Sequence, residues 1–289
     1  VFSWRLIARA IANRCNCSVL LMDRPGFGLS ERPYRHSFPD HANPYAITTQ
    51  VRIVLSLAQQ LGLKRLLLAG HADGALLALL AARAAAASIA VQVAGLLLLS
   101  PNMSNENVPT STRLLLQTKL GRQMLRPLLR SEIGDVAIRR AWYDASKLTR
   151  EVFELYKSPL RVEGWDRALY EVSRLKREVE QVEVKAVAAG IGSMPVMVIS
   201  GDHDRVVSPR RCAAVAAMFP SSLMRIIASC GHLPHEESPA NVVILITQFL
   251  NEVFSLENPM ATQVPQEGGG AGPSGVANIP PPIPPLAMR

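Results

Sequence analysis

A tight turn between two apolar segments constrains the fold of this chain more than any other feature. The run Leu66–Ala69 leads directly into Gly70-His71-Ala72-Asp73-Gly74, and an alanine- and leucine-rich segment follows at once. Glycine at both ends of the turn lets the backbone fold back without a Cβ clash. The pattern predicts a strand, a sharp turn and a helix, with Ala72 held out at the carboxyl edge of a sheet, ahead of a helix N-terminus.

Apolar runs alternate with segments of helical spacing on both sides of this turn. The expected strands are Ser18–Met22, Lys64–Ala69, Val91–Leu99, Pro195–Ser200 and Leu223–Ala228, and the expected helices are Phe2–Asn13, Tyr45–Leu61, Gly74–Ala87, Pro209–Met218 and Ala240–Phe254. Strands that alternate with helices are typical of a mostly parallel sheet covered by helices on both faces. The sequence therefore predicts an α/β fold.

The middle and the end of the chain depart from this alternation. Charged helical segments follow one another in the middle without strands between them, which predicts a helical lid inserted between two strands; they are Leu114–Leu129, Ile138–Tyr156 and Trp165–Val179. After Leu256, a sequence rich in Gly, Pro, Gln and Ala can bury too little apolar surface to order itself. We expect an α/β core in residues 1–101 and 193–255, a lid in 102–192 and a disordered tail in 256–289.

Composition narrows the class of protein. The chain has 289 residues, of which 48% are hydrophobic and 19% charged, and this suits one large domain with an insertion. The apolar stretch 75–100 is interrupted by Arg83, Ser88 and Gln92, so a buried helix and a buried strand explain it better than a transmembrane span. The four cysteines (Cys15, Cys17, Cys212 and Cys230) lack metal-site spacing, which predicts free thiols in a reducing intracellular compartment. Because the sequence shows neither a metal-binding cluster nor a phosphate-cradling loop, we expect no metal and no cofactor.

More than half of the formal net charge of +8 lies in the first part of the expected lid. Residues 102–150 hold nine Lys or Arg against four Asp or Glu. A solvated helix face is the favoured interpretation, and contact with anionic lipid or an acidic partner is the alternative. Because only Trp142 and Tyr143 lie among these charges, the pattern does not favour nucleic-acid binding.

Two later motifs place polar side chains at the same sheet edge as the turn. The loop GDHDRVV (Gly201–Val207) follows one expected strand, and CGHLPHE (Cys230–Glu236) follows the next. Acyl transfer needs a nucleophile, a base that takes its proton, and a carboxylate that orients the base. The second and third of these groups are therefore expected beside the turn.

These motifs, together with DRPGFGLSERP (Asp23–Pro33) and GHLPHEESP, resemble the lid-bearing branch of the α/β-hydrolase superfamily, which includes esterases, lipases, epoxide hydrolases and C–C bond hydrolases. The resemblance covers roughly residues 1–254. It implies that Asp204 is the acid and His232 the base of a catalytic triad, and that the backbone N–H of Asp73 is one oxyanion donor. It also implies a small apolar or acyl substrate.

The sequence departs from the family pattern in three ways. Ala72 occupies the position where the family has a nucleophile, usually Ser and in some branches Asp or Cys. The histidine-glycine loop that supplies the other oxyanion donor is absent, because the sequence begins just past its place. The early strands of the sheet are missing with it, so we expect an N-terminally truncated core with an uncovered sheet edge.

The other polar residues of these motifs are assigned simpler roles. A shift of one residue in so tight a turn points the side chain elsewhere, so Asp73 is not expected to replace the nucleophile. His71 and His203 are expected to be polar neighbours of the turns and His235 a structural residue beside His232. Asp202 is either an alternate acid or a loop hydrogen-bonding residue.

Two functions remain open from the sequence. The first is an ester or acyl hydrolase scaffold whose nucleophile is impaired or absent, with His232 left to activate water. The second is a non-catalytic, receptor-like protein that holds a small ligand between Asp204 and His232. An engineered or allelic change at Ala72 in an otherwise ordinary enzyme is a further alternative.

Overall fold

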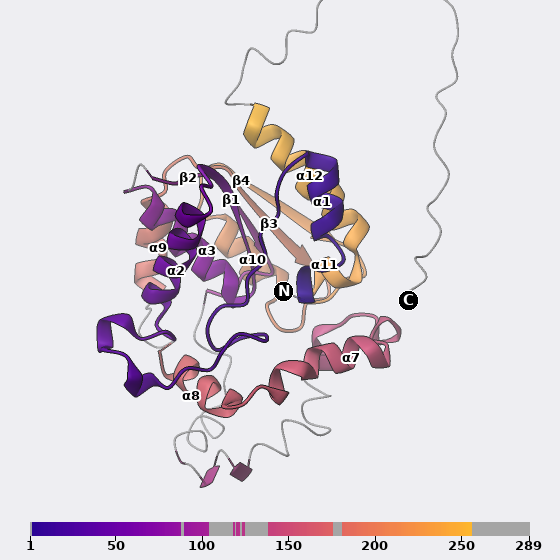
Figure 1. Ribbon diagram of the computed structural model, residues 1–289. Helices are drawn as coiled ribbons and strands as arrows, with labels where there is room; N and C mark the ends of the chain where they lie inside the picture. The colour runs from indigo at the N-terminus through magenta and orange to yellow at the C-terminus, as the bar shows by residue number, and fades with distance from the viewer. Residues whose placement is uncertain are drawn as a thin grey trace, which may run out of the picture.

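The computed structural model describes residues 2–87, 90–103, 118, 120–121, 123–124, 138–175 and 181–255. Within them a four-stranded parallel sheet has the order β1-β2-β3-β4, with bounds β1 Arg65–His71, β2 Gln92–Leu99, β3 Val196–Gly201 and β4 Ser222–Ile227 (Figure 1). The main helices around it are α1 Ala8–Cys15, α2 Ile47–Gln60, α3 Asp73–Ala85, α9 Gln181–Ala189, α10 Pro209–Ala216 and α12 Pro239–Ser255. The predicted α/β architecture is confirmed.

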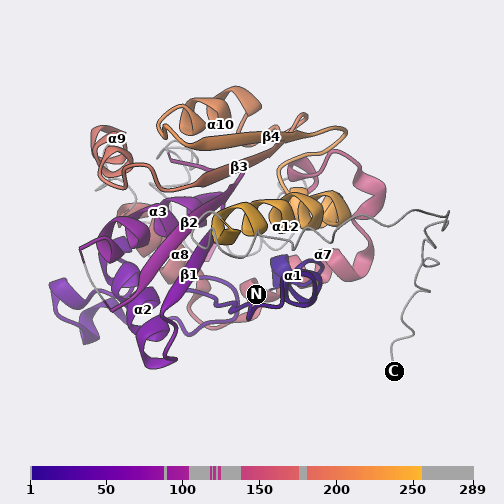
Figure 2. The same cartoon turned by 90° about the horizontal axis from the view of Figure 1, so that it is seen from above.

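Helices cover both faces of the sheet, as Figure 2 shows. Alternate side chains of β2 enter two different cores, because successive residues of a strand point to opposite faces. Leu96 and Leu98 pack with α3, α9 and α10, whereas Leu97 and Leu99 pack with α1 and α12. All four leucines are at most 1% exposed. The sheet is thus buried on both faces, which explains why its central strands are continuous apolar runs.

The predicted strand Ser18–Met22 is wrong. Residues 18–22 form no strand, and Val19 and Leu20 are 38% and 52% exposed. A strand needs a neighbour that pairs its backbone N–H and C=O groups, and in the described sheet β1 is an edge strand that pairs only with β2. The apolar run of residues 18–22 did not reveal that the described sheet offers it no neighbouring strand.

The predicted N-terminal helix is divided into two. A 3₁₀ turn covers Phe2–Trp4, and α1 begins only at Ala8. Ile7 and Ile11 are buried against the α12 side of the sheet. Of the apolar residues expected on one face of this helix (Leu6, Ile7, Ala10 and Ile11), Ile7 and Ile11 are buried but Leu6 is 46% exposed. The apolar spacing also overestimated the length of the helix.

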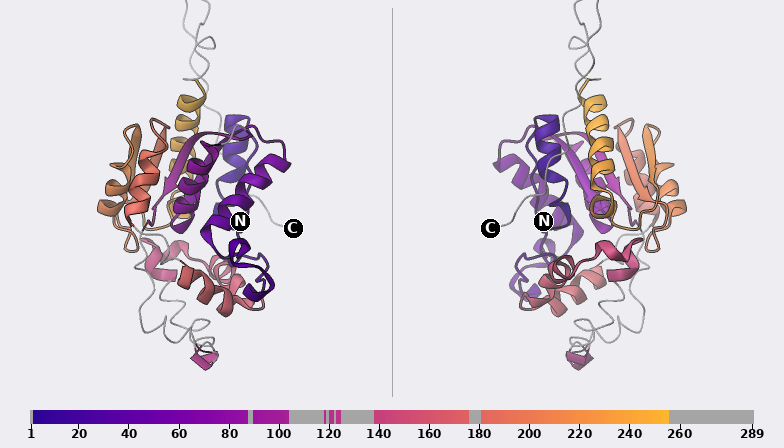
Figure 3. Two further views of the ribbon diagram at one scale, coloured as in Figure 1. Left: turned by 90° about the vertical axis from the view of Figure 1, so that its left-hand side faces the viewer. Right: turned by 90° about the vertical axis from the view of Figure 1, so that its right-hand side faces the viewer.

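Helical segments follow β2 and lie across the carboxyl end of the sheet (Figures 1 and 3). The predicted helix Ile138–Tyr156 is interrupted: residues 138–141 are helical, a 3₁₀ turn covers Ala145–Lys147, and α7 spans Arg150–Lys157. Thr149 caps α7, since its side chain accepts a hydrogen bond from the Val152 N–H. The helix α8, Trp165–Leu175, corresponds to the predicted Trp165–Val179.

The division into core and lid stays a prediction. Val184 and Ala188 of α9 pack in the same core as α3 and α10, although both lie within the expected lid of residues 102–192. Most of the predicted helix Leu114–Leu129 and the whole tail 256–289 lie outside the described residues. Within the part of the chain that is described, no helix is long and apolar enough to cross a membrane.

Candidate active site

The turn between β1 and α3 holds Ala72 in a strained conformation. Ala72 has φ of 50° and ψ of −118° and lies directly before the first residue of α3. Such a backbone costs a non-glycine residue roughly 1–3 kcal/mol and persists only where the surroundings enforce it. Here the Ala72 N–H donates to the Leu99 carbonyl at 3.0 Å, and the Ala72 carbonyl accepts from the Asn102 N–H at 3.1 Å. These two hydrogen bonds attach the turn to the end of β2. The side chain at the apex of the turn is only the methyl group of Ala72.

The two glycines of the turn are not equivalent. A Cβ atom added to Gly70 would lie 2.2 Å from the Gly74 carbonyl oxygen, so only glycine fits there. A Cβ atom added to Gly74 would meet nothing within 4 Å. The close approach of β1 and α3 thus requires glycine at position 70. Gly74 contributes the carbonyl oxygen that lies against Gly70.

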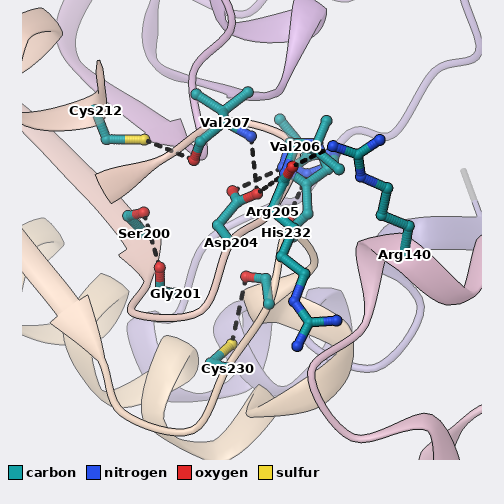
Figure 4. A network of polar contacts seen from close by, with 12 residues as sticks. Arg140, Ser200, Gly201, Asp204, Arg205, Val206, Val207, Cys212, Cys230 and His232 are labelled. Carbon is teal, nitrogen blue, oxygen red and sulfur yellow. Dashed lines mark hydrogen bonds and ion pairs between the residues drawn. The ribbon is translucent and has the colours of Figure 1, made fainter. Parts of the chain in front are cut away.

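Asp204 and His232 form a buried acid–imidazole pair. Asp204 Oδ2 lies 2.8 Å from His232 Nδ1, and Asp204 Oδ1 accepts hydrogen bonds from the N–H groups of Val206 and Val207, each at 2.8 Å (Figure 4). Burial alone would raise the pKa of Asp204, but the bonds from His232 and the two amides outweigh it, and the pKa lies below its ordinary value. A carboxylate that accepts the Nδ1 proton leaves His232 Nε2 as the basic nitrogen.

His71 places the turn beside this pair. The ring Nε2 of His71 donates to the backbone carbonyl of His232 at 2.8 Å, and the two ring centroids are 4.8 Å apart. Because His71 directly precedes Ala72, the apex of the turn and the His232 loop are neighbours. Desolvation, and then the nearby His232 ring, lower the pKa of His71 to about 3. A neutral His71 thus positions backbone atoms, in agreement with its expected role as a polar neighbour.

The side chain of Asp73 is held by a hydrogen bond and by a nearby charge. Asp73 Oδ1 accepts a hydrogen bond from Asn102 Nδ2 at 2.8 Å, and the carboxylate interacts electrostatically with the buried guanidinium of Arg24. Burial lowers the pKa of Arg24, and Asp73 opposes this shift. Asp73 is also the first residue of α3, so its N–H belongs to a helix N-terminus, the arrangement that an oxyanion donor needs.

In the GDHDRVV loop, Asp202 and His203 form a hydrogen bond with each other. Asp202 Oδ1 lies 2.6 Å from His203 Nδ1 and also accepts the Cys230 N–H at 3.1 Å. His232 is hydrogen-bonded to Asp204. Of the two roles left open for Asp202, the structure therefore shows the loop hydrogen-bonding one.

His235 lies beside His232 but has different partners. It is 0% exposed, stacks on Trp4 at 5.1 Å between ring centroids, and its Nε2 lies 2.5 Å from Ser3 Oγ. Burial lowers the pKa of His235 well below its ordinary value. These contacts are those of a structural residue that joins the N-terminal segment to α11, Pro234–Glu237.

Sequence reasoning missed two buried acids of α11, Glu236 and Glu237, each 4% exposed. Their only sequence signal is a pair of adjacent acids in the motif GHLPHEESP. Among the described residues, no group of His, Cys, Asp and Glu could hold a metal ion. All four cysteines are free thiols, and burial raises the pKa of Cys212 to about 11 and that of Cys230 to about 12.

Solved structures share this fold at low sequence identity. A putative acyltransferase from Salmonella enterica is 19% identical, with 87% of this chain and 84% of that chain covered and a TM-score of 0.67. A bromoperoxidase from Bacillus anthracis is 15% identical (86% and 87% covered, TM-score 0.65). A meta-cleavage product hydrolase from Pseudomonas fluorescens IP01 is 19% identical (87% and 85% covered, TM-score 0.63). Among curated proteins, no sequence matches this chain.

A family model described as the alpha/beta hydrolase family matches residues 2–244, which is most of the chain. The matched range includes the strained turn, the Asp204 loop and the His232 loop. This chain belongs to the alpha/beta hydrolase family.

Proposed function

We propose that this protein is an acyl-ester hydrolase scaffold without a covalent nucleophile, in which the Asp204–His232 pair promotes only direct attack by water. The observation that carries the proposal is the combination of a buried, hydrogen-bonded acid–base pair with a methyl group at the apex of the neighbouring turn. In the usual reaction of this site type, a hydroxyl at the apex attacks the carbonyl carbon while the histidine takes its proton. Ala72 cannot supply that hydroxyl.

The remaining groups define a shorter reaction. His232 Nε2 takes a proton from a water molecule, whose oxygen attacks the carbonyl carbon of the ester. The Asp204 carboxylate stabilises the resulting imidazolium, and the Asp73 N–H stabilises the oxyanion. The tetrahedral intermediate then expels the alcohol, which receives the proton from His232, and a carboxylic acid is the second product. No acyl-enzyme forms.

This reaction is expected to be slow. Triad residues act as a unit that contributes about 10⁶-fold to the rate, and their loss leaves roughly 10³- to 10⁴-fold over water from the oxyanion site and substrate binding. An acyl ligand bound at a site with this residual rate is hydrolysed far more slowly than in an intact hydrolase. The Ala72 methyl group, which cannot attack a bound ester, therefore also favours the second candidate function, non-catalytic ligand binding.

Restoring the hydroxyl separates these functions. We expect Ala72→Ser to raise the turnover of p-nitrophenyl esters by at least about 10²-fold, since the base is already in place. Ala72→Gly is the matched control, because it relieves the strained backbone without adding a nucleophile. Turnover by the unmodified chain that His232→Ala abolishes supports water attack. A folded Ala72→Ser variant that stays as inert as Ala72→Gly contradicts the hydrolase proposal and supports the binding function.

A further inference from the structure

Two adjacent buried carboxylates follow His232, and they bind different parts of the chain. Glu236 Oε1 accepts hydrogen bonds from Arg5 Nη1 at 2.5 Å and from the Tyr156 hydroxyl at 3.1 Å. The side chain of Glu237 binds a different set of groups. Its partners are backbone N–H groups in two other segments.

Glu237 connects the His232 loop to the segment that precedes α7. Its Oε1 accepts the Gly231 N–H at 2.8 Å, while its Oε2 accepts the N–H groups of Tyr143 at 2.9 Å and Asp144 at 3.2 Å. One carboxylate thus satisfies three backbone donors, two of them 93 or more positions away in the sequence. Removing this acceptor leaves the buried Gly231 N–H and the part-buried N–H groups of Tyr143 and Asp144 without their partner, and the desolvation cost is largest for the buried Gly231 N–H.

Further contacts join the same two segments directly. The His232 N–H donates to the Ala141 carbonyl at 2.7 Å, and Lys147 Nζ donates to the Glu237 carbonyl at 2.7 Å. The packing is tight, because a Cβ atom on Gly231 would lie 2.6 Å from the Ala141 carbonyl oxygen. The backbone of His232 is therefore held by Ala141 at its N–H and by His71 at its carbonyl.

We propose that Glu237 is a positioning residue for His232: it holds the His232 loop against residues 141–144 and so keeps Nδ1 aligned with Asp204. A carboxylate is required at this position, because its two oxygens accept three N–H groups from two separate segments. The amide of glutamine offers one oxygen and turns an NH₂ group toward the donors of the other segment. A displacement of residues 141–144 is transmitted through this carboxylate to the base.

The catalytic part of this inference rests on the proposed hydrolase function, but its geometric part does not. The geometric part is tested with Glu237→Gln, and Glu236→Gln is the matched control because it is an equally buried neighbour with other partners. Amide hydrogen exchange is measured at residues 143, 144, 231 and 232, and ring ¹⁵N chemical shifts at His232. We expect exchange at these amides to accelerate at least about tenfold in Glu237→Gln, the effect of one lost charged hydrogen bond, with altered His232 ring shifts.

The control decides the interpretation. We expect Glu236→Gln to leave both readouts at His232 unchanged while accelerating exchange in the N-terminal segment. If Glu237→Gln fails to fold, two milder variants replace it. Glu237→Asp keeps the carboxylate, and Lys147→Met removes the bond to the Glu237 carbonyl. We expect both to accelerate amide exchange and to alter the His232 ring shifts in the same direction, by smaller amounts. Unchanged exchange and ring shifts in Glu237→Gln, or equal changes in Glu236→Gln, overturn the proposal.

Turnover gives a second readout in the Ala72→Ser background. There we expect Glu237→Gln to lower kcat about tenfold with little change in KM, because the substitution acts on the base. An Ala72→Ser variant that is inert contradicts the proposed function but leaves the exchange and ¹⁵N results to decide the role of Glu237.

Discussion

Asp204 Oδ2 and His232 Nδ1 lie 2.8 Å apart and join the loop after β3 to the loop after β4. The other carboxylate oxygen of Asp204, Oδ1, is held by two backbone amides. The carboxylate is thereby oriented before any ligand binds. The carboxylate accepts the proton on Nδ1 of His232, which leaves Nε2 without a proton in the neutral ring.

Asp204→Asn tests whether this contact fixes the tautomer of His232. The asparagine oxygen is expected to stay on the amides of Val206 and Val207, so its NH₂ group faces Nδ1 and the ring proton moves to Nε2. In the Ala72→Ser background we expect ester turnover to fall roughly 10³- to 10⁴-fold while the fold is retained. Steady-state kinetics and near-ultraviolet circular dichroism measure the two effects. A loss of less than tenfold would show that the carboxylate does not set the tautomer.

Gly70→Ala and Gly74→Ala are a matched pair that tests the turn. A methyl group on Gly70 meets the Gly74 carbonyl oxygen at 2.2 Å, whereas one on Gly74 meets open space in the first turn of α3. We expect Gly70→Ala to lower the free energy of unfolding by about 3 kcal/mol or more. Gly74→Ala is expected to be neutral or to stabilise by up to about 1 kcal/mol. Urea unfolding measures both, and equal effects would contradict the close approach of strand and helix at Gly70.

The neutral imidazoles near the site predict a loss of stability in weak acid. Burial lowers the pKa of His71 to about 3, so between this value and the ordinary value near 6.5 the unfolded chain binds a proton that the folded chain does not. Stability from this group is present above pH 6.5 and is lost as pH falls, by up to about 1.4 kcal/mol per pH unit.

His71→Gln is expected to reduce this dependence. Urea unfolding at pH 7 and pH 5 should show a smaller decrease in the variant than in the unmodified chain. The exposed His36→Gln serves as the control and should keep the original slope. The same decrease in His71→Gln and in the unmodified chain would show that His71 is not the group that titrates.

Local sequence signals were sufficient for the turn and for the buried strands, because glycine spacing and apolar runs reflect steric and burial requirements at each position. They failed at Ser18–Met22, where an apolar run lacks a pairing partner, and at Phe2–Asn13, where a 3₁₀ turn interrupts the helical spacing. The proximity of Asp204 and His232 followed from their places after neighbouring parallel strands. The bonds of Glu237 to Tyr143 and Asp144 join distant segments, and no local pattern indicates them.

We propose that the Asp204–His232 pair stands beside a turn whose apex lacks the hydroxyl of a nucleophile. Labelling by a fluorophosphonate probe, with the modified residue located by mass spectrometry, tests it most directly. We expect Ala72→Ser to be labelled at position 72, the addition of His232→Ala to abolish the labelling, and the unmodified chain to remain unlabelled. A folded Ala72→Ser variant that resists the probe, or labelling that persists without His232, would contradict it.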